Sequence, residues 1–166
     1  MNRSLKLIVL LLILISLTAC TTKKEDNKEK SKEETKIEEK LEVNGYDLTL
    51  NKTATFENIR YKFPENTSIN SFGTYTLLIY DDEEQEKQVF KIGITKFGYS
   101  TPEETVKGEK KDTKTINGLE WILFDTEGNN TYAHQDGHDT YTITFISDDD
   151  LTIFENEFMK NVSVIE

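Results

Sequence analysis

The chain has 166 residues, with 31 acidic and 20 basic side chains and a formal net charge of −11. An acidic protein is repelled by phosphate backbones, so the composition argues against nucleic acid as a partner. Cys20 is the one cysteine, which excludes a disulfide within the chain, and the fold therefore has to be stable without such a cross-link.

Residues 1–19 have the parts of a bacterial export signal. Residues 1–6 are short and basic, and residues 7–17 are almost wholly aliphatic. As a helix, this apolar run spans about 17 Å, which is shorter than the roughly 30 Å hydrocarbon core of a membrane. We therefore predict a cleaved signal peptide and not a permanent transmembrane helix.

The signal ends in Leu17-Thr18-Ala19-Cys20, which resembles the lipobox of bacterial lipoproteins. Small residues before the cysteine give a signal peptidase access to the bond after Ala19, and the Cys20 thiol accepts a diacylglyceryl group. Acyl chains hold a protein at a membrane because each buried methylene contributes about 0.8 kcal/mol. The resemblance implies a mature chain that begins at Cys20 and is lipid-anchored on the extracytoplasmic face of the cell membrane.

Residues 20–40 are predicted to form a charged, flexible tether. From Thr21 to Lys40, seven lysines and seven acidic residues cancel. A segment so poor in apolar residues buries too little surface to offset the entropy of ordering it. Without the signal, 18 basic and 31 acidic side chains remain. The excess of −13 therefore lies in residues 41–166, which we predict to be one folded domain.

Short strands are predicted in the first half of this domain. Residues 46–50 and 56–63 alternate between apolar and polar side chains, and Pro64 ends the second strand. Residues 65–72 are mostly polar and are predicted to be a loop. Strands at residues 73–80 and 89–97 are expected to pair as a hairpin. The acidic run Asp81-Asp82-Glu83-Glu84 lies in the turn of this hairpin.

A short helix is predicted after this hairpin. Thr101 has the character of an N-cap, Pro102 stands at the first helical position, and Glu104 follows the cap by three residues. The helix is expected to end near Gly108. Asn117-Gly118 then favours a tight turn, which leads into a strand at residues 119–124.

Another hairpin and a final helix are predicted at the end of the chain. Residues 132–134 and 140–146 are expected to pair across a turn at residues 135–137. Asp150 is expected to cap a helix over residues 151–161, whose apolar residues recur at helical spacing. Residues 162–165 would close the sheet. This order of elements predicts an α+β class domain, in which an antiparallel β-sheet has helices packed against it.

Four segments together resemble PsbP-like domains, which include many bacterial lipoproteins. The aromatic, alternating segment from Phe56 to Pro64 is similar to the opening of these domains, and Phe154 to Val162 to their closing helix. Ser100 to Glu104 and Ile116 to Trp121 resemble their short helix and a strand entry. The tryptophan common after the opening proline is absent from residues 67–72. The resemblance implies an antiparallel sheet flanked by helices and a non-catalytic binding or extrinsic role.

His134 and His138 are the chain's two histidines, and with Asp136 and Asp139 they could form a surface site for zinc or copper. Their spacing brings two histidines to one face of a helix, whereas this segment is predicted to be a hairpin. We therefore favour an ordinary turn and predict no metal. Large aromatic residues near this hairpin, Trp121 above all, are expected to lie in the core.

The acidic runs Asp148-Asp149-Asp150 and Asp81-Asp82-Glu83-Glu84 lack the spacing of a calcium-binding EF-hand loop, and solvated turns and a helix cap explain them better. Neither a nucleophile motif nor a phosphate-binding loop is present. We therefore predict a non-catalytic binding or accessory module, without a cofactor, that serves an envelope or membrane protein. The alternatives are a metal-binding lipoprotein that uses His134 and His138 and, less favoured, an envelope hydrolase.

Overall fold

The computed structural model describes residues 40–84 and 86–165, which belong to one compact unit. The predicted signal peptide, Cys20 and residues 21–39 lie outside the described residues, so the predictions made for them stay predictions. Within the described ranges, no helix has the length and the apolar character needed to cross a membrane.

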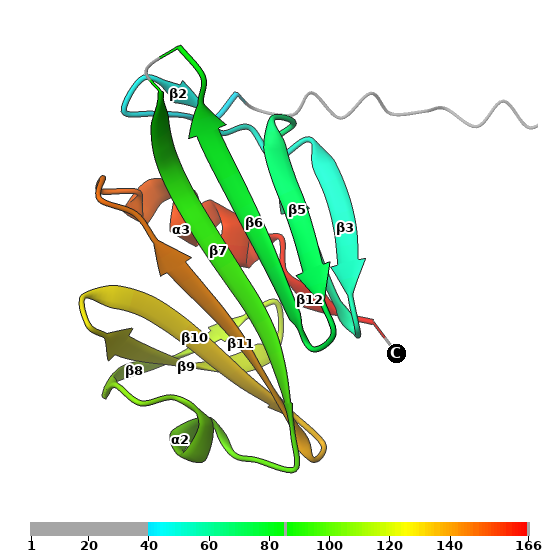
Figure 1. Cartoon of the computed structure of the whole chain (residues 1–166). Helices are drawn as coiled ribbons and strands as arrows, with labels where there is room; N and C mark the ends of the chain where they lie inside the picture. Colours follow the sequence, from blue (N-terminus) through cyan, green and yellow to red (C-terminus); the bar gives the residue numbers. More distant parts are fainter. Residues whose placement is uncertain (1–39, 85, 166) are drawn as a thin grey trace, which may run out of the picture. The chain divides into compact units, whose positions relative to one another are not determined.

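A seven-stranded antiparallel sheet runs through most of the domain (Figure 1). Its strands are β5 (Thr67–Phe72), β6 (Tyr75–Asp82), β7 (Lys87–Gly98), β8 (Glu109–Ile116), β9 (Leu119–Thr126), β10 (Asn129–Asp136) and β11 (Asp139–Ile146). The strand order is β5-β6-β7-β11-β10-β9-β8. Five of its six ladders join strands that are consecutive in the chain, and β7 with β11 is the exception.

Two smaller antiparallel sheets complete the domain. β3 (Lys52–Phe56), β4 (Ile59–Phe63) and β12 (Ser163–Val164) form a three-stranded sheet in the order β12-β4-β3. β1 (Glu42–Val43) and β2 (Tyr46–Asp47) form a hairpin, in which Val43 pairs with Tyr46. In Figure 1, β2 lies at the same end of the domain as the turn between β6 and β7.

The core is aromatic, and the helix α3 (Thr152–Lys160) lies at its centre. Phe154 and Phe158 are four residues apart and therefore share one face of this helix. The Phe154 ring stacks on Phe90 of β7 at 4.8 Å, and the Phe158 ring lies 6.1 Å from Tyr61 of β4. The same helix thus connects the two larger sheets. Trp121 is fully buried in this core, as the sequence predicted.

The helix α2 (Pro102–Thr105) confirms the predicted helix start. The Thr101 side chain accepts a hydrogen bond from the backbone N–H of Glu104, and the Glu104 carboxylate accepts one from the backbone N–H of Thr101. This reciprocal capping box satisfies two backbone donors that a helix start otherwise leaves free. After the helix, Val106 packs with Phe124 and Ala133 in a small second core.

The predicted α+β class is wrong. Strands make up 59% of the described residues and helices 10%, so this is a β-rich fold of antiparallel sheets. The two predicted helices exist, but they have four and nine residues and are too short to form a helical layer. The β-content is larger than expected because three polar segments are strands. The sheet flanked by helices that the PsbP-like resemblance implied is therefore wrong as well.

The short strand β1 was not predicted, and neither were the longer strands β5, β8 and most of β3. Residues 67–72 form β5 and not a loop, and residues 109–116 form β8. The strand predicted at residues 56–63 is in fact two elements, because the chain turns at Glu57, which has a φ of 52°. Glutamate carries no sequence signal for such a left-handed turn, since glycine or asparagine is the usual choice.

The tight turn predicted at Asn117-Gly118 is present. Asn117 and Gly118 have φ values of 52° and 78°, and they join β8 to β9 with Ile116 paired to Leu119. Positive φ at both central residues is the requirement of the type I′ turn that suits the twist of paired strands. The predicted pairing of residues 132–134 with 140–146 is also confirmed, in the ladder between β10 and β11.

Candidate functional site

An acidic pocket lies where β2, the start of β5 and the end of β6 meet. It has a volume of about 520 Å³, larger than the pockets of about 180 and 210 Å³ elsewhere in the described part of the chain. Its lining is formed by Gly45, Tyr46, Asp47, Asn66, Ser68, Tyr80, Asp81, Asp82, Glu83 and Glu84. We call it the acidic pocket below.

The lining of the acidic pocket carries one sign of charge. Five of its residues are carboxylates, Asp47 from β2 and the run from Asp81 to Glu84, and none of the described lining residues is basic. Carboxylates gathered around one concavity raise the local concentration of cations and of cationic groups. Two tyrosines, Tyr46 and Tyr80, add aromatic surface beside them, and such surface also attracts cations. The Tyr46 ring already has a cation of this chain near it, since the Lys87 Nζ lies 5.9 Å from its centroid.

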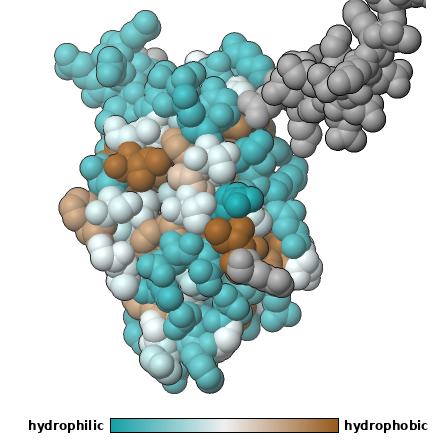
Figure 2. All heavy atoms as spheres, turned by 90° about the vertical axis from the view of Figure 1, so that its right-hand side faces the viewer, coloured by the Kyte–Doolittle hydropathy of each residue, from teal (hydrophilic) through white to brown (hydrophobic). Residues whose placement is uncertain are grey.

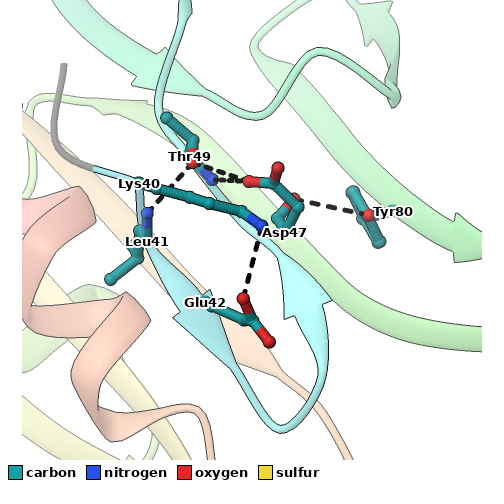
Figure 3. Close-up of polar contacts among 6 residues, drawn as sticks. All are labelled: Lys40, Leu41, Glu42, Asp47, Thr49 and Tyr80. Carbon is teal, nitrogen blue, oxygen red and sulfur yellow. Dashed lines mark hydrogen bonds and ion pairs between the residues drawn. The ribbon is translucent and has the colours of Figure 1, made fainter. Parts of the chain in front are cut away.

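Asp47 is held in place by Thr49, two residues further along the chain (Figure 3). The Thr49 hydroxyl donates a hydrogen bond of 2.6 Å to the Asp47 carboxylate, and the Thr49 backbone N–H donates another of 3.2 Å. The Thr49 hydroxyl oxygen in turn accepts from the backbone N–H of Leu41. These bonds favour the charged carboxylate, and the Thr49 hydroxyl bond above all lowers the pKa of Asp47.

Tyr80 approaches Asp47 from the other side (Figure 3). Its hydroxyl points at the main-chain oxygen of Asp47 at 3.5 Å, a long contact. Burial raises the pKa of Tyr80, and the neighbouring charges of Asp47 and Asp82 raise it further. Tyr80 is therefore neutral, and its hydroxyl keeps the proton that it directs at the Asp47 main-chain oxygen.

Replacing Thr49 by valine should raise the pKa of Asp47 towards its ordinary value, because the variant loses the hydroxyl that donates to the carboxylate. A carboxyl group whose pKa is lowered by folding stabilises the fold above its unfolded pKa, and this contribution disappears as the pH falls through the folded pKa. The part of the stability difference between wild type and Thr49→Val that comes from this carboxylate should therefore be present at neutral pH and vanish in acid, whereas the part that comes from the lost bond to the Leu41 N–H should remain. Carboxyl NMR titration measures the pKa directly.

Asp150 provides the internal control for this titration. Its carboxylate accepts from the hydroxyl and the backbone N–H of Thr152 at 2.7 and 3.1 Å, which lowers its pKa in the same way. In Thr49→Val the titration of Asp150 should be unchanged. An Asp47 titration that also stays unchanged would show that the Thr49 hydroxyl does not set its pKa.

A second carboxylate, Glu155 of α3, is buried and serves the fold. Its side chain accepts hydrogen bonds from the Asn130 amide at 2.9 and 3.1 Å and from the Tyr132 hydroxyl at 2.6 Å. Burial raises the pKa of Tyr132, and the bond to Glu155 raises it further. With its acceptors used in this way, Glu155 fastens α3 to β10.

The structure does not bring His134 and His138 together with the predicted aspartates. The His134 ring nitrogen Nδ1 lies 2.8 Å from the main-chain oxygen of Glu120, and the ring packs beside Trp121 at 5.2 Å. His138 lies in the turn between β10 and β11 and stacks on Tyr99 at 5.9 Å. In the described residues, no three His, Cys, Asp or Glu side chains are placed to hold one metal ion, Asp136 and Asp139 included.

The acidic run Asp148-Asp149-Asp150 has structural roles in two of its members. Asp149 forms an ion pair of 2.6 Å with Lys87 of β7. Asp150 accepts a hydrogen bond from the backbone N–H of Thr152, the first residue of α3. Leu151 stands at the N-cap position itself, and its side chain makes no capping bond. The other acidic run, residues 81–84, supplies four of the five carboxylates of the acidic pocket. Sequence reasoning treated the two runs alike, although their surroundings differ.

Comparison with known proteins gives no family. No family model matches the chain, and no curated protein matches it. Among solved structures, a protein from Bacteroides thetaiotaomicron VPI-5482 is similar with 12% sequence identity and a TM-score of 0.45. The similarity covers 66% of this chain and 46% of that one, so this chain spans less than half of its length. A likeness of this degree assigns neither a fold family nor a function.

Proposed function

We propose that this chain is a lipid-anchored extracytoplasmic binding protein. Cys20 would attach it to the cell membrane, and the β-rich domain would present its acidic pocket to an envelope or membrane protein. In this proposal the protein is an accessory module and catalyses no reaction.

The observation that carries the anchoring is the tetrad Leu17-Thr18-Ala19-Cys20 after a basic and then an aliphatic segment. The cysteine is the chain's only one, and a charged segment follows it directly. A lipidated cysteine followed by residues that cannot bury an apolar face is the arrangement expected of a domain held at a distance from a bilayer.

The acidic pocket supports the binding role. Its carboxylates come from two segments, β2 and the end of β6, that the fold brings to one concavity. The net charge also lies on the domain and not on the tether, since residues 41–166 carry the whole excess of −13. Such a surface favours a cationic partner and disfavours anionic lipid head groups.

Metabolic labelling with an alkyne-bearing fatty acid tests the anchoring. We expect the wild-type protein to be labelled and to begin at Cys20 by mass spectrometry, whereas Cys20→Ser should be unlabelled and keep its signal. Thr22→Ser, a change of similar size two residues away, is the matched control and should be labelled like the wild type. Equal labelling of Cys20→Ser and wild type would contradict the proposal.

A further inference from the structure

The two edges of the seven-stranded sheet differ in their protection. β8 has five charged residues among eight, and its register shifts between Lys110 and Asp112. The Asp112 carboxylate also accepts from the backbone N–H of Thr113. Charged side chains, lysine above all, and irregularities are the usual devices that prevent an edge strand from pairing with another chain. β5 at the other edge, with the sequence Thr-Ser-Ile-Asn-Ser-Phe, has no charged residue.

β5 is also exposed along its length. Every residue from Ser68 to Phe72 is exposed, and the Phe72 side chain retains 68% of its accessible surface. Figure 2 views the molecule from the side on which β5 and β3 lie, and apolar patches appear there among hydrophilic residues. An uncharged, exposed edge with an apolar residue at its end is a template for strand addition.

Backbone groups of β5 point away from β6 at alternate residues. The two-residue turn after Phe72 is closed by the pair Phe72 and Tyr75, which makes this a hydrogen-bonded pair. Alternation then makes Ile69 with Leu78 and Ser71 with Thr76 non-hydrogen-bonded pairs. The N–H and C=O groups of Ile69 and Ser71 are thus directed outward, and no hydrogen bond within the described part of the chain uses them.

The acidic pocket lies at the beginning of this edge. Asn66, directly before β5, and Ser68, within it, both line the pocket together with the five carboxylates. A strand added alongside β5 would therefore reach the pocket at one of its ends. Two separate features, free backbone groups and a concentration of negative charge, meet at this place.

Two kinds of strand could add to this edge, one from a second copy of this chain and one from another protein, and charge favours the second. A second copy of this chain would bring another domain with a net charge of −13 and a second set of the same carboxylates to the edge. Like charges brought together in this way oppose association, whereas a basic segment complements the pocket. An antiparallel added strand is favoured because its hydrogen bonds are perpendicular to the strands and slightly stronger.

We propose that β5 is the docking edge for an extended, basic segment of a partner protein. The segment adds to the sheet as an antiparallel strand beside β5 and places cationic side chains near its C-terminal end in the acidic pocket. The inference rests on the proposed binding function and deepens it by naming the surface and the chemistry of the partner.

The test uses a fluorescent synthetic peptide, TVTVTVRR with blocked ends, and the chain from Thr21 onward, without the signal and the lipid-bearing cysteine. This chain keeps every residue of the main core, which extends from Val43 to Val162. Fluorescence anisotropy should show saturable binding of TVTVTVRR. The peptides TVTVTVEE, in which the charge is reversed, and TVPVPVRR, which cannot pair as a strand, should each bind at least about tenfold more weakly.

Ile69→Pro is the decisive variant. It removes an outward N–H of β5 and no ladder bond, so proline is tolerated at this edge. We expect affinity for TVTVTVRR to fall by about tenfold or more. Thr115→Pro is the matched control, because Thr115 pairs with Glu120 as an outward-facing, exposed residue of β8. It should bind the peptide like the wild type. Ile69→Lys keeps the N–H and should also weaken binding, by repelling the basic peptide.

Other results would overturn the inference. Absence of saturable binding would do so, as would equal binding by the wild type and both Ile69 variants, or equal binding of TVTVTVRR and TVTVTVEE. A dimer of the wild type that Ile69→Pro dissociates in sedimentation would instead identify a second copy as the occupant. None of these results alters the labelling of Cys20, so failure of the docking edge is distinguishable from failure of the anchoring.

Discussion

The Phe154→Ala variant should lose about 3–5 kcal/mol of its free energy of unfolding. Phe154 is fully buried, and its ring stacks on Phe90 of β7 at 4.8 Å and lies 6.1 Å from Phe158. The substitution removes a whole ring from the contact between α3 and the sheet, and the rigid strands around it can close the cavity only in part. Denaturation in urea, followed by circular dichroism, measures this loss.

Ile153→Ala is the matched control for this prediction. Ile153 precedes Phe154 in the same helix, but its side chain is 66% exposed. Its removal should change the free energy of unfolding by no more than about 0.5 kcal/mol. Equal losses in the two variants would show that α3 contributes through helix formation and not through the packing of its inner face.

The Gly108→Ala variant should be destabilised by about 1–3 kcal/mol, or more if the backbone cannot move. A Cβ atom at Gly108 would lie 2.3 Å from the main-chain oxygen of Asp125 and 2.8 Å from the Thr126 side chain. Asp125 belongs to β9, and it pairs with Glu109 at the start of β8. Because the obstacle is backbone, the two strands have to separate at this point. Thermal unfolding should show a lower melting temperature for Gly108→Ala than for the wild type.

Gly98→Ala provides the comparison, since Gly98, the last residue of β7, is exposed like Gly108 but has more room around it. Apart from its neighbours in the chain, a Cβ atom there would come no closer than 3.7 Å to another residue, at the Asp139 carboxylate, which is ordinary van der Waals contact. Its melting temperature should stay near that of the wild type. If Gly108→Ala melted at the same temperature as Gly98→Ala, the close approach of β8 and β9 would be wrong.

The interior of the sheet was predictable from the sequence, and its edges were not. β6, β7, β9 and β11 are rich in apolar and aromatic residues, because these strands have neighbours on both sides and cover the core. β5, β8 and β3 stand at the edges of their sheets and are largely exposed. Their polar residues satisfy the ladder without showing an apolar pattern, so they were predicted as loops or left unassigned.

The error in fold class follows from the same cause. The sequence signals for the two helices were correct, including the Thr101 capping box, but three missed edge strands made the helices look like a larger share of the domain. An amphipathic helix can be predicted from the apolar periodicity of one short segment. A polar edge strand is defined by its partner, and Ile69 is part of a strand because Leu78 lies beside it.

Only part of the acidic pocket could be identified from the sequence. The run from Asp81 to Glu84 was identified, whereas Asp47, Tyr80 and Ser68 were not associated with it. The local signal for Asp47 was Thr49 two residues later, a spacing typical of an Asx-turn, in which the aspartate side chain accepts bonds from the following residues. The meeting of β2 with β5 and β6 is a product of tertiary structure, and residues so far apart give no local pattern.

The strand order has a consequence for how the chain reaches this structure. Within the large sheet, every ladder except the one between β7 and β11 closes over a short turn at little cost in chain entropy. Gly98 and Asp139 pair although the whole of β8, β9 and β10 lies between them in the chain. From this separation in sequence we expect two hairpin arrays, β5 to β7 and β8 to β11, to form first, and their joining along the ladder between β7 and β11 to be slower.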